Sequence, residues 1–217
     1  MTMKRFLPIL LGLLLAAPLF AATDTNAPAE DAEAKYTKDI ENRTQNILNV
    51  LALADTNKVA SVHDTIIAQW RALRAWHDYN DAKLKKNKDT NEVATINASL
   101  KALHNQFIGN LSKDLTPQQV DVVKDKMTYG VVQVTYNAYL GMYPNLTDAE
   151  KQQILAWLIE ARETSMDQGT SNEKHAVFGK YKGRINNYLS KEGYDAQTGK
   201  KKTDQLTGLS NTNQPAK

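Results

Sequence analysis

Two clusters of residues in this sequence could carry chemistry, and the first is centred on His77. In the string RALRAWHDYNDAK, His77 falls on the apolar stripe of a helical pattern. Asp81 follows four residues later, within reach of the imidazole. Histidine titrates near neutral pH, so His77 could act as a general acid or base with its tautomer fixed by Asp81. The alternative interpretation is a hydrogen-bonded histidine of the core.

The second cluster is the string HAVFGKYKGRINNYLS, residues 175–190. It reads as an amphipathic helix that carries Gly179 and Gly183 on the face away from its apolar side. One interpretation is that these glycines let another helix or a loop approach closely. The other is that they form the floor of a groove in which a sugar lies against the backbone. In that case the donors are Lys180, Arg184, Asn186 and Asn187.

Arginine suits this second interpretation because its planar guanidinium binds a carboxylate in a bidentate manner. The groove would therefore accept uronic acids as well as neutral sugars. A phosphate or a protein partner is a third possibility for the same cations. Tyr136 and Tyr139 are further ligand-binding candidates, because aromatic rings stack on the apolar faces of sugars; packing in the core is the alternative for both.

Catalysis has only scattered candidates. They are His77, Asp81, His175 and Arg184, and no spacing among them defines a reaction. The four histidines show no metal-ligand motif, and no phosphate-binding glycine loop is present, so no metal and no cofactor are expected. Nucleic-acid binding is not expected either. Without Lys4 and Arg5, 25 of the 27 basic residues remain, and they nearly balance the 24 acidic ones.

The elements that must position these residues are helices. Apolar residues recur at helical spacing along most of the chain, as in Val59, Val62, Ile66, Trp70 and Leu73. Capping boxes predict helix starts at Thr116, Thr147 and Thr170. The β-branched string VVQVTY, residues 131–136, is interpreted as a bend leading into a short helix that ends before Pro144. The prediction is an all-α protein, a single compact domain of about six or seven helices with disordered termini.

The N-terminus predicts export. Lys4 and Arg5 precede an apolar run from Phe6 to Phe20 and small residues at Ala21 and Ala22, the order of a secretory signal peptide. The predicted organisation is a signal peptide at 1–21, a linker at 22–33, a helical domain at 34–195 and a disordered tail at 196–217. The absence of cysteine excludes disulfides and fits a periplasmic or secreted bacterial protein. Because the apolar run is short and no second one follows it, no membrane insertion is expected after cleavage.

Two long strings carry a family resemblance: DKMTYGVVQVTYNAYLGMYPNLT and EKHAVFGKYKGRINNYLSKEGYD. They resemble the family of exported bacterial proteins of unknown function numbered 3826, from about Tyr36 to Tyr194. Members tend to be encoded with polysaccharide-degradation systems and are described as sugar-binding. The resemblance thus implies a glycan-related role. Gln133 stands where the family suggests a proline, and no catalytic residue carries over.

The resemblance therefore implies an exported, non-enzymatic protein of a polysaccharide-utilisation system that binds an oligosaccharide or polysaccharide, acidic chains included. The first alternative is a glycan-active lyase or hydrolase using His77, His175 and Arg184. The second is a periplasmic helical chaperone or stress protein, because the string LTPQQ resembles a motif of small periplasmic chaperones.

Overall fold

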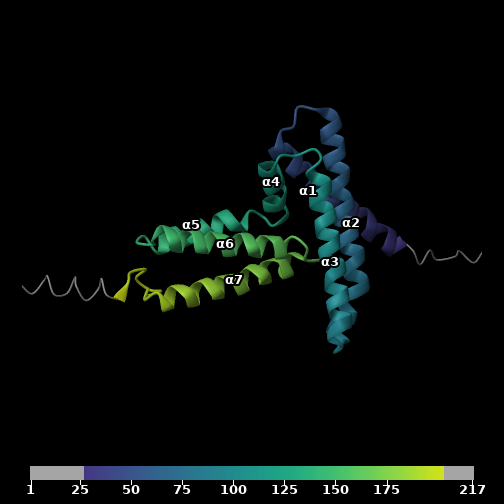
Figure 1. Ribbon diagram of the computed structural model, residues 1–217. Helices are drawn as coiled ribbons and strands as arrows, with labels where there is room; N and C mark the ends of the chain where they lie inside the picture. Colours follow the sequence, from purple (N-terminus) through teal and green to yellow (C-terminus); the bar gives the residue numbers. More distant parts are fainter. Residues whose placement is uncertain (1–26, 203–217) are drawn as a thin grey trace, which may run out of the picture. The chain divides into compact units, whose positions relative to one another are not determined.

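The computed structural model describes residues 27–202, and these form seven α-helices and no strand, which confirms the all-α prediction (Figure 1). None of these helices is long and apolar enough to span a membrane. The helices are α1 (Ala27–Leu51), α2 (Thr56–Lys86), α3 (Thr90–Leu111), α4 (Pro117–Met127), α5 (Val131–Met142), α6 (Asp148–Ser165) and α7 (Ser171–Lys191).

The chain divides into two units between Thr37 and Lys38, within α1. The beginning of α1 belongs to the first unit, and the rest of α1 and the other helices belong to the second. The predicted signal peptide at 1–21 lies outside the described residues. The helix α1 begins at Ala27, inside the range that we predicted as a linker. The alanines and glutamates of this stretch have high helix propensity, which the linker interpretation underestimated.

The three predicted capping boxes are present. Thr116, Thr147 and Thr170 each accept a hydrogen bond from the main chain three residues later, and the Glu or Gln there accepts one in return. Two further helices begin at aspartates: Asp55 caps α2 and Asp89 caps α3. Side-chain oxygens thus fix where five of the described helices begin.

The string 131–136 differs from its prediction, because it forms the first half of α5 rather than a bend. The bend lies just before it, where Tyr129 and Gly130 both have left-handed backbone conformations. Val132, Thr135 and Tyr139 follow at helical spacing and are buried, so burial of this face outweighs the β-branched propensity. The helix ends before Pro144, as predicted.

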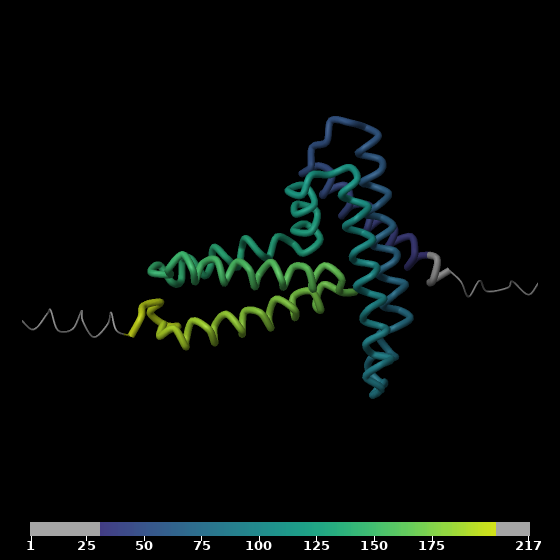
Figure 2. Tube along the Cα trace, in the orientation of Figure 1, coloured from purple at the N-terminus to yellow at the C-terminus, as the bar shows by residue number. Residues whose placement is uncertain are grey.

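The helices pack in two groups within the second unit. α2 and α3 pack side by side, and α6 packs against both α5 and α7 (Figures 1 and 2). α4 contacts α6. The group formed by α5, α6 and α7 has a core of fully or largely buried side chains, which includes Leu158, Phe178 and Ile185. Each such side chain contributes about 1.5–3 kcal/mol by leaving water.

The chain after α7 is ordered as far as the structure describes it. Tyr194 and Lys201 form an isolated antiparallel bridge, and Tyr194 is buried in the core cluster. The predicted disordered tail at 196–217 therefore begins with a turn that packs on the domain, because the Tyr194 ring anchors it. Gly199 lies in this turn with a left-handed conformation, against the main chain of Met142.

Candidate functional site

The outer face of α7 is the best candidate site. On the inner face of α7, Phe178, Ile185 and Leu189 are buried, whereas Gly179 and Gly183 on the outer face are exposed. Among residues 27–202, no neighbouring heavy atom lies within 4 Å of where a Cβ would stand on either glycine. The interpretation in which these glycines let another helix or a loop of the described chain approach closely is therefore wrong. Backbone is exposed at both positions, and a surface hollow lies on each flank of the helix.

The first hollow, here called the Trp157 hollow, lies between α6 and α7 and has a volume of about 680 Å³. Trp157 comes from α6 and meets the ring of Tyr188 edge-on, with 5.2 Å between the ring centroids. The Arg184 guanidinium lies 4.5 Å from the centroid of the Trp157 ring and 3.4 Å from a carboxylate oxygen of Glu160. The complete lining is Trp157, Lys180, Gly183, Arg184, Asn187, Tyr188 and Lys191.

This hollow combines three kinds of group. It offers a flat aromatic wall, a stretch of bare backbone at Gly183, and cationic or amide donors on long side chains. Such a mixture of apolar surface and a few polar groups is typical of sites for small polar molecules. Its cations favour ligands with negative charge.

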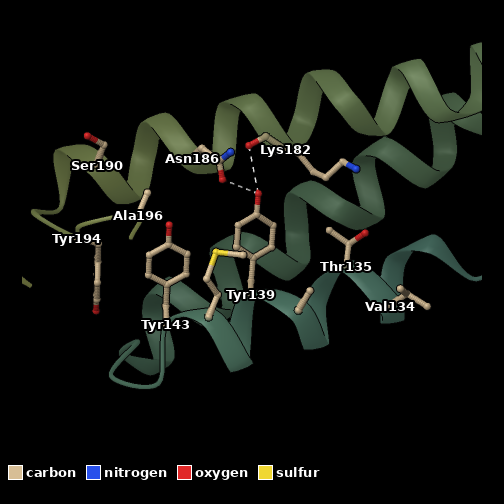
Figure 3. Close-up of a pocket in the computed structure, with 11 residues that line it drawn as sticks. Val134, Thr135, Tyr139, Tyr143, Lys182, Asn186, Ser190, Tyr194 and Ala196 are labelled. Atoms are coloured by element: carbon tan, nitrogen blue, oxygen red, sulfur yellow. Dashed lines mark hydrogen bonds between the residues drawn. The ribbon is translucent and has the colours of Figure 1, made fainter. Parts of the chain in front are cut away.

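The second hollow, here called the Tyr139 groove, lies between α5 and α7 and has a volume of about 440 Å³ (Figure 3). Its α5 edge is apolar, with Val134, Ala138 and Met142 at four-residue spacing. Its α7 edge is polar, with Lys182, Asn186 and Ser190 at the same spacing. The rest of the lining is Thr135, Tyr139, Tyr143, Tyr194 and Ala196.

Tyr139 joins the two edges of this groove. Its hydroxyl donates to the Asn186 side-chain oxygen at 2.8 Å and approaches the main-chain oxygen of Lys182 at 3.2 Å (Figure 3). Burial raises the pKa of Tyr139 to about 12, so the hydroxyl stays protonated and acts as a donor. Because the Asn186 oxygen is occupied, its amide NH₂ is the group left for a ligand.

The far end of the groove is held rigid by Tyr194. Its hydroxyl lies 2.9 Å from both the main-chain oxygen of Asn145 and the carboxylate of Glu150. Burial would raise the pKa of Glu150, but hydrogen bonds from Thr147 and Tyr194 and the contact with Lys201 outweigh it and lower this pKa. Glu150 is therefore a charged anchor for the groove wall.

Most of the predicted ligand-binding residues lie in these two hollows. Lys180, Gly183, Arg184 and Asn187 line the Trp157 hollow, while Tyr139 and Asn186 line the Tyr139 groove. Gly179 is exposed on the same helix, and Tyr136 packs against the core cluster instead. Trp157 and Lys182 also line these hollows but were not among the predicted site residues. Their positions depend on how α6 and α5 pack on α7, and no local pattern signals that.

The candidate catalytic residues occupy separate surroundings. His77 is largely buried, with Nδ1 2.9 Å from the Asp81 carboxylate and Nε2 2.8 Å from the main-chain oxygen of Asp167. His175 is exposed and stacks on Tyr129. Arg184 follows nine residues later on the same helix, a rise of about 13 Å. Both ring nitrogens of His77 are occupied, and the three residues do not face one cleft.

A cluster of charged side chains joins α3, α4, α6 and the start of α7. His104 binds Asp167, and Arg162 binds Asp121 at 2.6 Å and Asp125 at 2.8 Å. The hydrogen bond to Asp167 raises the pKa of His104 above its usual 6.5. The other partners in this cluster are Lys124, Glu163 and Lys174. The cluster positions α7; among the described residues, no group of three or more histidines and carboxylates is arranged to hold a metal ion.

The fold and the site together define an all-α domain with surface hollows on both flanks of its last helix. The family described as "Protein of unknown function (DUF3826)" has a model that matches residues 37–206. The match covers most of the chain, so this protein belongs to that family, as the two strings around α5 and α7 predicted. Comparison with curated proteins finds no match.

Proposed function

We propose that this protein binds oligosaccharide or polysaccharide chains on the outer face of α7. The observation that carries the proposal is the position of Trp157 beside the exposed backbone of Gly183, with Arg184 and Asn187 on the same hollow. A sugar ring needs an apolar surface for its C–H face and donors for its hydroxyls. The Trp157 hollow offers both within one volume of about 680 Å³.

The charge of the hollow favours acidic sugars. Lys180, Arg184 and Lys191 all line it, and Glu160 partly neutralises Arg184. A uronate carboxylate could replace Glu160 on the guanidinium, since the Arg184–Glu160 pair is exposed and such pairs contribute little free energy. The bound carboxylate would then lie beside the Trp157 ring. We expect uronate-containing chains to bind more tightly than neutral ones.

The proposed cellular role is that of a non-enzymatic accessory protein for polysaccharide utilisation, exported to the periplasm or secreted. It rests on the glycan-related role that the resemblance to the family implies and on the signal-peptide pattern of residues 1–21. A lyase or hydrolase remains the alternative. It gains no support from the separate positions of His77, His175 and Arg184. The chaperone alternative rests on LTPQQ, which here is the capping box that begins α4.

A panel of acidic and neutral plant-cell-wall oligosaccharides tests the proposal. Melting temperature and product formation are followed together for the wild type, Trp157→Ala and Tyr79→Ala. Tyr79 is the control because its aromatic ring also lies under a cation, as that of Trp157 does, but it is exposed on α2, whereas Trp157 is half-buried. The proposal predicts a rise in melting temperature that Trp157→Ala removes and Tyr79→Ala keeps. Products would favour catalysis, and no shift across the panel would refute both glycan functions.

A further inference from the structure

A third hollow lies away from the glycan site, between α1, α2, α4 and the turn that precedes α5. We call it the Trp70 pocket; its volume is about 290 Å³. The buried side chains of Ile47, Trp70 and Met127 form its floor. Its exposed rim is polar and consists of Arg43, Asn46, Lys126 and Tyr129.

Positive charge collects around this pocket. The Arg43 guanidinium lies 5.8 Å from the centroid of the Trp70 ring, and Nζ of Lys174 lies 5.3 Å from the same centroid. Lys174 is only 3% exposed and donates to the main-chain oxygen of Met166. Arg43 is close enough to destabilise the charged form of Lys174. The positive charges of Arg43 and Lys174 thus lie close to the same Trp70 ring, and Lys126 lies on the rim of the same pocket.

Carboxylates do not balance this charge at the rim. In the described part of the chain, neither Arg43 nor Lys126 has an ion pair with a carboxylate. The carboxylate that acts on Lys174 is Asp167, which already binds His104 at 2.8 Å. Cations that face one pocket without carboxylate partners repel one another and attract an anion.

The rim also contains strained backbone. Tyr129 has φ of 60°, a conformation that costs a non-glycine residue about 1–2 kcal/mol. This conformation places its ring 5.5 Å from the ring of His175, nearly parallel to it, while Tyr129 also lines the pocket. Such strain is concentrated at ligand sites in proteins.

We propose that the Trp70 pocket binds a small molecule through an oxyanion, a phosphate or carboxylate group held between Arg43 and Lys126. The floor of Ile47, Trp70 and Met127 would cover the apolar part of the same ligand. Guanidinium and ammonium groups form charge-assisted hydrogen bonds with either oxyanion. The proposal is independent of the glycan site, because the lining of the pocket comes from α1, α2, α4 and the turn before α5, whereas the Trp157 hollow is lined by α6 and α7.

Fluorine NMR of 5-fluorotryptophan-labelled protein tests this proposal. The chain has three tryptophans, so the resonances of Trp70, Trp76 and Trp157 are assigned with single Trp→Phe variants. Inorganic phosphate and acetate are titrated in separate experiments, with ionic strength held constant by sodium chloride. We expect at least one of them to move the Trp70 resonance saturably while Trp76 stays fixed. The oxyanion that acts at lower concentration identifies the ligand class.

Two exposed-site variants and a control complete the test. Arg43→Gln and Lys126→Gln should each weaken the Trp70 response about tenfold or more, since each removes a charge-assisted hydrogen bond. Lys85→Gln, an exposed lysine elsewhere on α2, should leave it unchanged. No saturable movement of Trp70 with either oxyanion would overturn the proposal. So would a response that persists in the Arg43→Gln/Lys126→Gln double variant. Trp157 reports separately on the glycan site, so failure of one proposal leaves the other intact.

Discussion

His104 on α3 and Asp167, just after α6, form a hydrogen bond of 2.8 Å between Nδ1 and Oδ2. Asp167 also accepts a hydrogen bond from His77 of α2 through its main-chain oxygen. One residue of the α6–α7 connection thus joins both helices of the α2–α3 pair to the start of α7. The position of the candidate glycan site therefore depends on an ionisable contact far from it.

This contact predicts a pH dependence of stability. Asp167 raises the pKa of His104 in the folded state, so the contribution of His104 is complete below 6.5, its usual pKa, and is lost as pH rises through the raised value. Urea unfolding of the wild type and His104→Asn should differ by about 1.5–3 kcal/mol at low pH, and by less as pH rises. His63 also has a raised pKa, but it is present in both proteins, so its contribution cancels in the difference between them. A difference that grows with pH would contradict the assignment.

Arg162 should matter far more to stability than Arg184. The Arg162 side chain is 7% exposed and binds Asp121, Asp125 and Glu163, whereas the Arg184–Glu160 pair is exposed. We expect Arg162→Met to cost about 2–3 kcal/mol in the free energy of unfolding. Arg184→Met should cost less than about 1 kcal/mol. Equal losses in chemical denaturation would show that the cluster does not anchor α6.

Two glycine substitutions should change stability in opposite directions. A Cβ at Gly169 would lie 2.9 Å from Cγ of His77, whose ring is held through both nitrogens and cannot easily move. Gly169→Ala should therefore lower the free energy of unfolding by about 1–3 kcal/mol. Gly183→Ala enters open space on a helix and should raise it by about 0.5–1 kcal/mol. Thermal melting of both variants checks the signs, and a destabilised Gly183→Ala would contradict the open helix face.

A larger side chain at Gly183 should separate stability from binding. Gly183→Gln should keep or raise the melting temperature but block the backbone beside Trp157, so oligosaccharide affinity should fall about tenfold or more. Gly109→Gln is the matched control, because Gly109 is also an exposed helical glycine with open space around it, on α3. Affinities are compared by calorimetry. Unchanged affinity in Gly183→Gln would mean that the ligand does not contact this backbone.

Helix starts and the faces of helices were predictable from the sequence, because both depend on residues a few positions apart. The capping boxes at Thr116, Thr147 and Thr170 are examples, and so is the four-residue spacing of His77 and Asp81. The grouping of glycines and donors on the outer face of α7 follows from the same periodicity. This local information was sufficient to place six of the eight predicted ligand-binding residues on hollows.

Features made by distant residues were not predictable in this way. The Trp157 hollow requires α6 to pack on α7, and the charge cluster joins residues such as Asp125 and Arg162 that lie far apart in sequence. The early start of α1 and the helical string 131–136 were missed for another reason. Composition at 22–33 and β-branched propensity at 131–136 favoured other structures, but alanine-rich helix propensity and burial on α5 outweigh these signals.

The most direct test of the glycan-binding proposal is the fluorine resonance of Trp157 during titration with uronate-containing and neutral oligosaccharides. The proposal predicts a saturable movement of this resonance, at lower concentration for acidic chains, and its loss in Gly183→Gln. A ligand that raises the melting temperature while Trp157 stays unmoved would contradict the assignment of the Trp157 hollow. An unmoved Trp157 with every oligosaccharide would contradict the proposed function itself.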